Sequence, residues 1–291
     1  KAIHANNNIF LSFRVEESPN QNLYFQILNM DLNPIGDAIA ISSPTTSKQG
    51  FDMTFGEDEF IYYAYSEDYN IYLKKLNSNG GLVWGPQLIV ESSADDIIKA
   101  VYPLPGSGCL IIYESEHWQT GSNIYAVAID GDEGQIQDNW PVLLSDLSAD
   151  QYYENSVQTS DGIFISFKDN TSGNYNLYGQ YLAFNGNLNS GNSGITIADG
   201  AHDQQSSTLT YNIDQNTIFI CYVTSDGTET DILCNEIQLS DQSISSTVIA
   251  SDNTYNQEAP NTYWSGSSYL ITWEDERNSA AYKYKLHFRY H

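Results

Sequence analysis

Residues 269–290 of this 291-residue chain read YLITWEDERNSAAYKYKLHFRY. The stretch begins with an apolar strand that ends on the aromatic residue Trp273. It continues through the acidic turn 274–277 and returns in a second strand centred on Tyr284. Apolar and polar side chains that alternate with a period of two are typical of a β-strand with one buried face. The stretch therefore predicts a β-hairpin with an aromatic anchor at the end of its first strand.

Five weaker copies of this hairpin precede it. Aligned on the anchor residue, the six first strands end at Phe13, Tyr65, Tyr113, Phe167, Tyr222 and Trp273, at intervals of 52, 48, 54, 55 and 51 residues. A polar turn and a second strand follow each anchor, at 22–28, 70–76, 123–129, 176–182, 231–237 and 283–288. A fixed period near fifty, built from strand-like units, indicates stacked or radial repetition.

Two further segments complete each repeat. Short apolar runs follow the second strands at 38–41, 87–90, 141–144, 195–198 and 247–250, and more polar runs precede anchor strands at 49–55, 155–159, 206–211 and 259–264. Six repeats of four strands predict an all-β fold, a six-bladed β-propeller of four-stranded antiparallel blades. A long sandwich and a β-solenoid are the alternatives. A sandwich gives no reason for a sixfold period, and a solenoid rung would be shorter.

The predicted blades divide a single domain, 1–291, at approximately 1–47, 48–94, 95–149, 150–202, 203–253 and 254–291. No turn and no fourth strand follow the second strand of the last repeat. We therefore expect the last blade to lack its outer strand in this sequence, and the domain to be part of a longer secreted protein.

Three short patterns carry a resemblance to a known repeat. WEDER at 273–277, the NIY and NLY that open several second strands, and NSNGGLVWG at 77–85 resemble the repeat W-x-D-x-R, D-I-Y-x-Q, D-x-x-G-x-x-x-W-G of secreted bacterial surface proteins. Trp273, Asp275 and Arg277 match the first motif completely, whereas Phe167 and Asp169 match it in part. The resemblance implies propeller blades, an extracellular or cell-surface location and a role in binding or display. It brings no catalytic residues, because the motif is structural.

The net charge of the chain excludes some classes of binding partner. Lys and Arg number 11 against 37 Asp and Glu, which gives a formal net charge of −26. A field of that sign repels phosphate backbones and disfavours anionic membrane surfaces. The sequence contains no apolar run of 18 residues, so we expect no transmembrane helix and no membrane insertion. A glycan, a surface protein or a cation such as Ca²⁺ remains compatible, and we expect a monomeric domain.

The sequence leaves open whether two of the three cysteines form a disulfide. Cys221 and Cys234 lie on adjacent predicted strands, equally far from the turn that joins them. A register in which they face each other would permit a cross-strand disulfide, and otherwise the two pack as small apolar side chains. Cys109 has no partner and is predicted to be buried. Zinc-type Cys/His spacings are absent.

Two sets of residues are candidates for binding. The turns between each anchor strand and the second strand carry acids that would gather on one face and could coordinate calcium through oxygen. The alternative is that they cap their turns and face water. The predicted metal ligands are Glu67, Asp68, Asp169 and Asp275. Glutamines at the start of the innermost strands, with nearby aromatic residues, form a predicted glycan site, unless the amides bind the backbone of a neighbouring blade. This second set is Gln49, Gln151, Gln205, Gln257, His117, Trp118, Tyr153 and Tyr255.

No residue in the sequence requires catalysis. Many carboxylates are present but no pair stands out as the two that a glycoside hydrolase needs, and no nucleophile elbow or phosphate-binding Gly loop occurs. The sequence thus predicts a non-catalytic binding or adhesion propeller without a required cofactor. The alternatives are a propeller glycoside hydrolase or lyase and a structural spacer domain.

Overall fold

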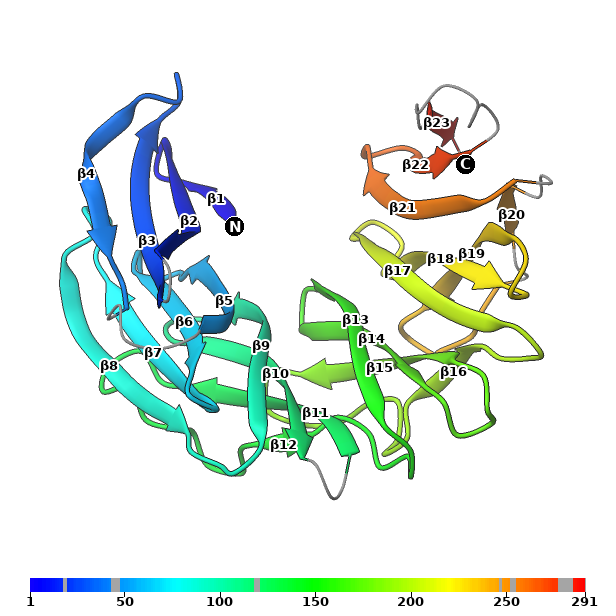
Figure 1. Cartoon of the computed structure of the whole chain (residues 1–291), viewed down its shortest axis with the longest axis horizontal. Helices are drawn as coiled ribbons and strands as arrows, with labels where there is room; N and C mark the ends of the chain where they lie inside the picture. Colours follow the sequence, from blue (N-terminus) through cyan, green and yellow to red (C-terminus); the bar gives the residue numbers. More distant parts are fainter. Residues whose placement is uncertain are drawn as a thin grey trace. The chain divides into compact units, whose positions relative to one another are not determined.

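The computed structural model describes residues 1–17, 20–42, 48–117, 121–245, 248–251, 255–276 and 285–290. These residues form β-strands, turns and loops without a helix, and the strands pair in antiparallel sheets (Figure 1). None of the described segments is a helix long and apolar enough to cross a membrane. The chain divides into two compact units, Lys1–Leu143 (unit 1) and Leu144–His291 (unit 2).

Unit 1 contains three sheets of four strands, each in the order of the sequence. The first consists of β1 (Ala2–Ala5), β2 (Asn8–Glu17), β3 (Asn20–Asn29) and β4 (Pro34–Ala40). The second consists of β5 (Lys48–Phe55), β6 (Ile61–Glu67), β7 (Asn70–Leu76) and β8 (Leu82–Val90). The third consists of β9 (Asp95–Pro103), β10 (Cys109–His117), β11 (Gly121–Ile129) and the short β12 (Val142–Leu143).

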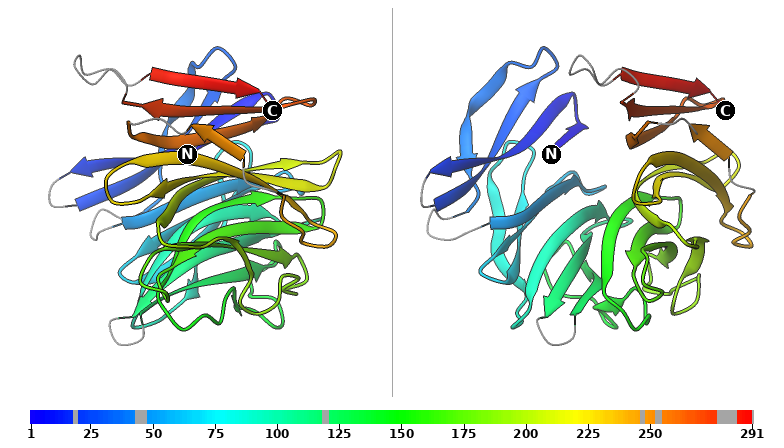
Figure 2. Two further views of the ribbon diagram at one scale, coloured as in Figure 1. Left: turned by 90° about the vertical axis from the view of Figure 1, so that its right-hand side faces the viewer. Right: turned by 45° about the vertical axis from the view of Figure 1, so that its right-hand side comes forward.

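Unit 2 repeats the plan, and Figure 2 shows its sheets from two further directions. The fourth sheet consists of β13 (Gln151–Gln158), β14 (Gly162–Asp169), β15 (Asn176–Ala183) and β16 (Ile195–Ala198). The fifth consists of β17 (Asp203–Asn212), β18 (Thr217–Ser225), β19 (Thr230–Gln238) and β20 (Val248–Ser251). The sixth has three strands among the described residues: β21 (Gln257–Trp264), β22 (Tyr269–Asp275) and β23 (Lys285–Tyr290).

These sheets confirm the predicted all-β class and the predicted grouping of strands. Every anchor strand and every second strand of the sequence pattern falls on one of the observed strands, and the sixth sheet is one strand short in the described residues. Within each unit the first strands of successive sheets lie side by side, β5 beside β9, β13 beside β17 and β17 beside β21. Closure of all six sheets into one ring stays a prediction.

Cross-strand aromatic pairs explain the repeated sequence pattern. Each of the first four anchors lies directly opposite the tyrosine of the following NLY or NIY, and the two rings stack at centroid distances of 5.5–5.8 Å. The pairs are Phe13–Tyr24, Tyr65–Tyr72, Tyr113–Tyr125 and Phe167–Tyr178. Aromatic neighbours across a strand pair stabilise both register and sheet. The anchor and the NLY or NIY tyrosine are thus the two halves of one cross-strand contact.

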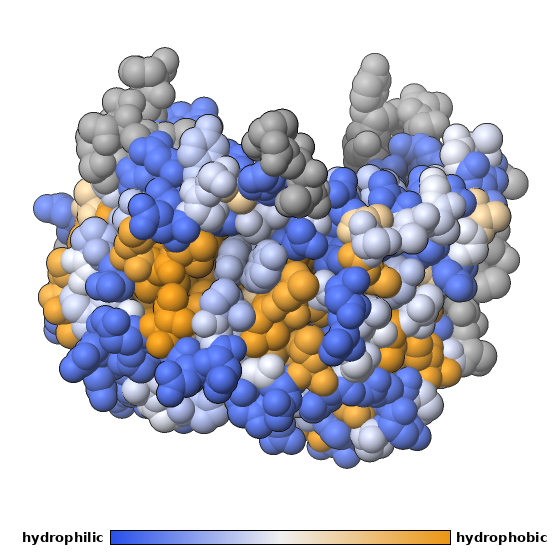
Figure 3. Space-filling model, turned by 90° about the horizontal axis from the view of Figure 1, so that it is seen from below, coloured by the Kyte–Doolittle hydropathy of each residue, from blue (hydrophilic) through white to orange (hydrophobic). Residues whose placement is uncertain are grey.

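The core of each unit lies between successive sheets. In unit 1, Phe10, Phe25 and Met53 belong to one buried cluster, and Ile98, Val101 and Ile111 to the next. The surface keeps some apolar side chains, mainly on outer strands and turns, such as Leu82 at 57 % exposure. On the face drawn in Figure 3, hydrophobic patches accordingly lie among hydrophilic residues.

Five of the six anchors are buried, as the repeat pattern predicts: Tyr65, Tyr113, Phe167, Tyr222 and Trp273. The equivalent expectation is wrong for Phe13, which is only partly buried. The side chains of Phe10 and Ser12 on β2 are turned toward the second sheet, so Phe13 lies on the opposite face. In the described part of unit 1 no sheet covers that face, and Tyr24 remains its aromatic neighbour.

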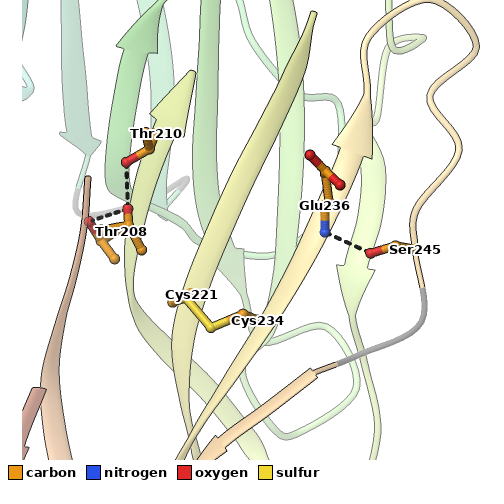
Figure 4. The surroundings of a disulfide bond; sticks show 7 residues. Thr208, Thr210, Cys221, Cys234, Glu236 and Ser245 are labelled. Atoms are coloured by element: carbon orange, nitrogen blue, oxygen red, sulfur yellow. Dashed lines mark hydrogen bonds between the residues drawn. A yellow bond between two sulfur atoms is a disulfide. The ribbon is translucent and has the colours of Figure 1, made fainter. Parts of the chain in front are cut away.

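Cys221 and Cys234 form a disulfide, which settles the choice that the sequence left open. They lie directly opposite each other on β18 and β19 (Figure 4), with a Cα–Cα distance of 4.1 Å. The bond lies in the buried cluster of unit 2 that is formed by residues of the fifth and sixth sheets. Cys109 is a buried free thiol, as predicted.

Loss of this disulfide is expected to lower the free energy of unfolding by about 2 to 3 kcal/mol, because the crosslink closes a short loop of the unfolded chain. Urea unfolding with and without dithiothreitol measures the effect. The Cys221→Ala/Cys234→Ala double variant is the control: its stability should not respond to the reductant. If dithiothreitol lowered the free energy of unfolding of that variant by the same amount, the effect would not come from the Cys221–Cys234 bond.

Candidate functional site

The hairpins of unit 2 carry a row of polar residues at one end, two positions beyond each anchor. Asp169, Thr224 and Asp275 occupy the row on β14, β18 and β22. Their partners on the first strands are three glutamines, Gln151, Gln204 and Gln257. On the third strands of the fourth and fifth sheets the partners are Asn176 and Asp231. We call these residues the polar row.

A pocket of ≈ 110 Å³ lies beside the polar row of the fifth sheet. Its lining residues are His202, Thr224, Asp226, Glu229 and Asp231. Four of them come from the ends of β18 and β19 and the turn between them, and His202 directly precedes β17. The β18–β19 hairpin thus presents three carboxylates and a hydroxyl to one small space, and His202 adds an imidazole.

The turn holds Asp226 in a fixed position. Its Oδ1 accepts hydrogen bonds from the backbone N–H of Thr228 (2.8 Å), the Thr228 hydroxyl (2.6 Å) and the backbone N–H of Glu229 (2.9 Å). Gly227 between them has φ of 87°, a conformation that glycine adopts without strain. An aspartate that accepts hydrogen bonds from the next residues in this way is typical of a tight turn.

These hydrogen bonds also set the charge of the pocket. The Thr228 hydroxyl and the backbone N–H groups of Glu229 and Thr228 lower the pKa of Asp226 to about 2, because they favour the carboxylate over the acid. Asp226 therefore stays ionised throughout the neutral and mildly acidic range. No Lys or Arg is among the residues that line the pocket. The site can accept hydrogen bonds from hydroxyl or amine groups, and it repels anions.

A segment that carries an exposed aromatic residue is hydrogen-bonded to the start of β19, beside this pocket. Tyr255 is 47 % exposed and precedes β21. The backbone N–H of Gln257 donates to Thr230 Oγ1 (3.0 Å), and the Gln257 amide donates to the carbonyl of Tyr255. These bonds attach the segment around Tyr255 to the start of β19, between the pocket residues Glu229 and Asp231.

The predicted glutamine set is divided by the structure. Gln151 and Gln257 are fully buried, and their amides donate to the carbonyls of Leu147 (3.0 Å) and Tyr255. Both acceptors are local backbone, not the neighbouring blade of the alternative interpretation. Gln49, in unit 1, is exposed and donates to Asp95 (3.0 Å). In the fifth sheet Gln204, not the expected Gln205, occupies the equivalent position, because the β17–β18 hairpin is one residue pair longer.

The predicted aromatic set is also dispersed. Tyr153 is partly buried and its hydroxyl lies 2.6 Å from Ser156 Oγ. His117 ends β10 in unit 1, and Trp118 lies outside the described residues. Of this set, Tyr255 belongs to the segment that is hydrogen-bonded to Thr230, the residue between Glu229 and Asp231 of the pocket.

The four predicted calcium ligands do not all lie in exposed turns on one face, as the sequence pattern had suggested. Asp68 is exposed at the turn after β6 and Glu67 is half-buried, whereas Asp169 and Asp275 are 0 % and 1 % exposed. Burial follows from their place at the ends of strands, on the polar row, instead of in the turns. Within the described ranges no group of three or more His, Cys, Asp or Glu side chains could hold a metal ion.

None of the five pocket residues is among the metal ligands or the glycan-site residues predicted from the sequence. The signal that could have indicated them is the run TSDGTETD at 224–231, in which a glycine turn is flanked closely by acids. His202 has no such signal, because only the packing of β17 against β18 brings it to the pocket.

Comparison with known proteins bears on the fold. Over 99% of this chain and 86% of the other, a putative 6-phosphogluconolactonase from Bacteroides fragilis is similar at a TM-score of 0.53 and 12% identity. A subtype N10 neuraminidase-like protein of A/little yellow-shouldered bat/Guatemala/060/2010 is similar at a TM-score of 0.52 and 9% identity, over 97% and 88%. No protein-family model and no curated sequence matches the chain. At these identities the likeness shows a shared all-β architecture and no shared chemistry.

Proposed function

We propose that this chain is a glycan-recognising β-propeller and that it binds its ligand at the acidic pocket of unit 2. The observation that carries the proposal is the combination of fixed hydrogen-bond acceptors with a neighbouring exposed aromatic ring. Asp226 is held by its turn, Glu229 and Asp231 line the same pocket, and the segment that carries Tyr255 is hydrogen-bonded to Thr230 between them. Sugar rings offer hydroxyl donors at their edges and an apolar face to an aromatic side chain. A few well-placed polar groups are what fixes the orientation of a small ligand.

The charge of the site indicates the kind of glycan. Three carboxylates without a lining Lys or Arg would repel uronic and sialic acids, and the chain as a whole carries −26. Neutral sugars and amino sugars carry no such penalty, and a protonated amine would gain from the field. We therefore expect neutral or amino sugars to bind and acidic sugars to be excluded.

The proposal includes an extracellular location and a single six-bladed domain. The disulfide between Cys221 and Cys234 supports an extracellular location, because such bonds persist in oxidising compartments. Six antiparallel sheets support six blades in one domain. A surface-exposed or secreted domain that recognises a glycan, or a glycan on a surface protein, fits these features together.

Replacing Asp226 by asparagine is expected to weaken glycan binding by about tenfold or more, since a hydrogen bond to a charged group contributes about 1.5 to 3 kcal/mol. Replacing Tyr255 by alanine should also weaken binding, because the apolar face of the sugar loses its aromatic neighbour. A glycan array with neutral, amino and acidic sugars identifies the ligand, and calorimetry then measures Kd for each variant. Tyr263→Ala is the matched control, because Tyr263 lies at the other end of β21 and is 65 % exposed. Binding that survives both pocket substitutions, or that is lost equally in the control, would contradict the proposed site.

Glycoside hydrolysis is the second candidate function, and the three carboxylates in one pocket favour it. Hydrolysis needs one carboxylate and one carboxylic acid on either side of the scissile bond. Asp226, with its low pKa, could serve only as the ionised partner, and Glu229 or Asp231 would have to supply the proton. Release of reducing ends from the array ligand, abolished in Glu229→Gln, would establish hydrolysis. Stable binding without release of product would contradict hydrolysis and leave glycan recognition as the proposed function.

A further inference from the structure

The polar row of the fourth sheet contains three oxygen-bearing side chains that face one another. Gln151 lies directly opposite Asp169, and Asp169 lies directly opposite Asn176. Residues in direct register across antiparallel strands point to the same face, with Cβ atoms about 4.5 to 5.5 Å apart. All three are buried, at 0 %, 0 % and 5 % exposure.

The hydrogen bonds of the two amides fix which of their atoms remain available. Gln151 Nε2 donates to the carbonyl of Leu147 (3.0 Å), and Asn176 Nδ2 donates to Ser172 Oγ (2.8 Å). Because both nitrogens have acceptors, the amide oxygens are the free ends. Gln151 Oε1 and Asn176 Oδ1 are buried without a hydrogen-bond partner among the described residues.

Asp169 is the charged member of the row. Its Oδ1 accepts from the backbone N–H of Thr171 (2.8 Å), while Oδ2 is buried and has no donor in the described chain. Lys168, the adjacent cation, points to the other face and pairs with Glu154 at 2.8 Å. A buried carboxylate oxygen without a donor is costly. Here it stands beside two amide oxygens, which are also acceptors.

Such a set of three acceptors without donors fits a hard cation. Calcium takes carboxylate and amide oxygens together, completing six to eight ligands with backbone carbonyls and water. We propose that Gln151 Oε1, Asp169 Oδ2 and Asn176 Oδ1 bind a calcium ion that ties together β13, β14 and β15. With a single carboxylate, the affinity belongs in the weak range of extracellular modules, with Kd of about 10⁻⁴ to 10⁻³ M. The site is separate from the glycan pocket and does not depend on it.

The fifth sheet offers an internal comparison. Its row has Gln204 opposite Thr224 and Thr224 opposite Asp231, so a neutral hydroxyl stands where the fourth sheet has the Asp169 carboxylate and the acid lies on the third strand instead. Ion binding at the Gln204–Thr224 pair is therefore not part of the proposal. A calcium response of the whole protein should depend on Asp169 and be independent of that pair.

Calcium at ten times its Kd is expected to raise Tm by about 3 to 6 °C, from the binding of an ion to the folded state alone. The melts compare calcium, magnesium and sodium at matched ionic strength, because any salt screens a chain of this charge. Asp169→Asn should abolish the calcium-specific rise, whereas Asp161→Asn, an exposed carboxylate at the β13–β14 turn, should retain it. An equal rise with magnesium or sodium, or a rise that persists in Asp169→Asn, would overturn the proposal.

Terbium luminescence gives a second measurement that is independent of stability. Tyr178 lies two positions after Asn176 on β15, and therefore on the same face of the sheet, which places this tyrosine close enough to sensitise a bound lanthanide. Terbium emission excited through tyrosine should saturate, be displaced by calcium and fall at least tenfold in Gln151→Leu, while Gln204→Leu should leave it unchanged. Emission that is unaffected by Gln151→Leu would show that the ion binds elsewhere.

Discussion

Replacing Trp273 by alanine is expected to destabilise unit 2 by about 3 to 5 kcal/mol, the range for removal of a large aromatic side chain from a core. Trp273 is 5 % exposed and belongs to a cluster with Phe219, Val223 and Ile271. The cluster joins the fifth and sixth sheets, so the cavity would form at the contact between them. Few neighbouring side chains could relax into it, because the Cys221–Cys234 disulfide constrains the same cluster.

Urea unfolding followed by far-UV circular dichroism measures this change. Tyr263→Ala, on the preceding strand and 65 % exposed, is the control and should cost less than about 0.5 kcal/mol. A loss of less than 1 kcal/mol for Trp273→Ala would mean that the sixth sheet does not pack as described.

The second large effect is expected at a buried ion pair of unit 1. Lys75 Nζ lies 2.8 Å from Asp58 Oδ2, donates to the carbonyl of Gly131 (2.6 Å) and lies 4.1 Å from the centre of the Phe60 ring. The side chains of Lys75 and Asp58 are 6 % and 15 % exposed. The Tyr62 hydroxyl also donates to Asp58 Oδ2 (2.7 Å). The group connects the second sheet to the turn after β11 in the third.

Asp58→Asn is expected to destabilise unit 1 by about 3 kcal/mol, because it leaves the Lys75 ammonium buried without its counter-ion. The Asp58→Asn/Lys75→Met double variant should recover part of this loss, since it removes the uncompensated charge. Glu16→Gln is the matched control: Glu16 lies 3.7 Å from Arg14 in an exposed pair, and such pairs contribute at most about 1 kcal/mol. Equal losses for Asp58→Asn and Glu16→Gln in urea unfolding would contradict the role of burial.

The pair also predicts the direction of an acid effect. Burial raises the pKa of Asp58, but the hydrogen bonds from Lys75 and Tyr62 outweigh it, and the pKa lies below its ordinary value. A lowered pKa in the folded state stabilises the fold above the ordinary aspartate pKa, and this contribution is lost as the pH falls through the folded value. The Asp58 contribution is therefore complete at neutral pH.

The sequence alone determined the repeating framework of this protein. Alternation of apolar and polar residues and the period of the anchors identify strands such as β7 (Asn70–Leu76) and β16 (Ile195–Ala198) at their observed bounds. The physical reason is that each hairpin is a local structure: its turn, its aromatic cross-strand pair and its register lie within about twenty residues. The same locality made a Cys221–Cys234 bond foreseeable as one of two outcomes.

Only the tertiary structure decided which polar residues are buried and which meet. Asp169 and Glu67 both stand two residues beyond their anchors, yet Asp169 is fully buried whereas Glu67 is only half-buried. One extra residue pair in the β17–β18 hairpin moves the equivalent position from Gln205 to Gln204, and packing brings His202 to Asp226. Burial depends on the sheet that covers a side chain, as Phe13 shows, and no local pattern in the sequence records that neighbour.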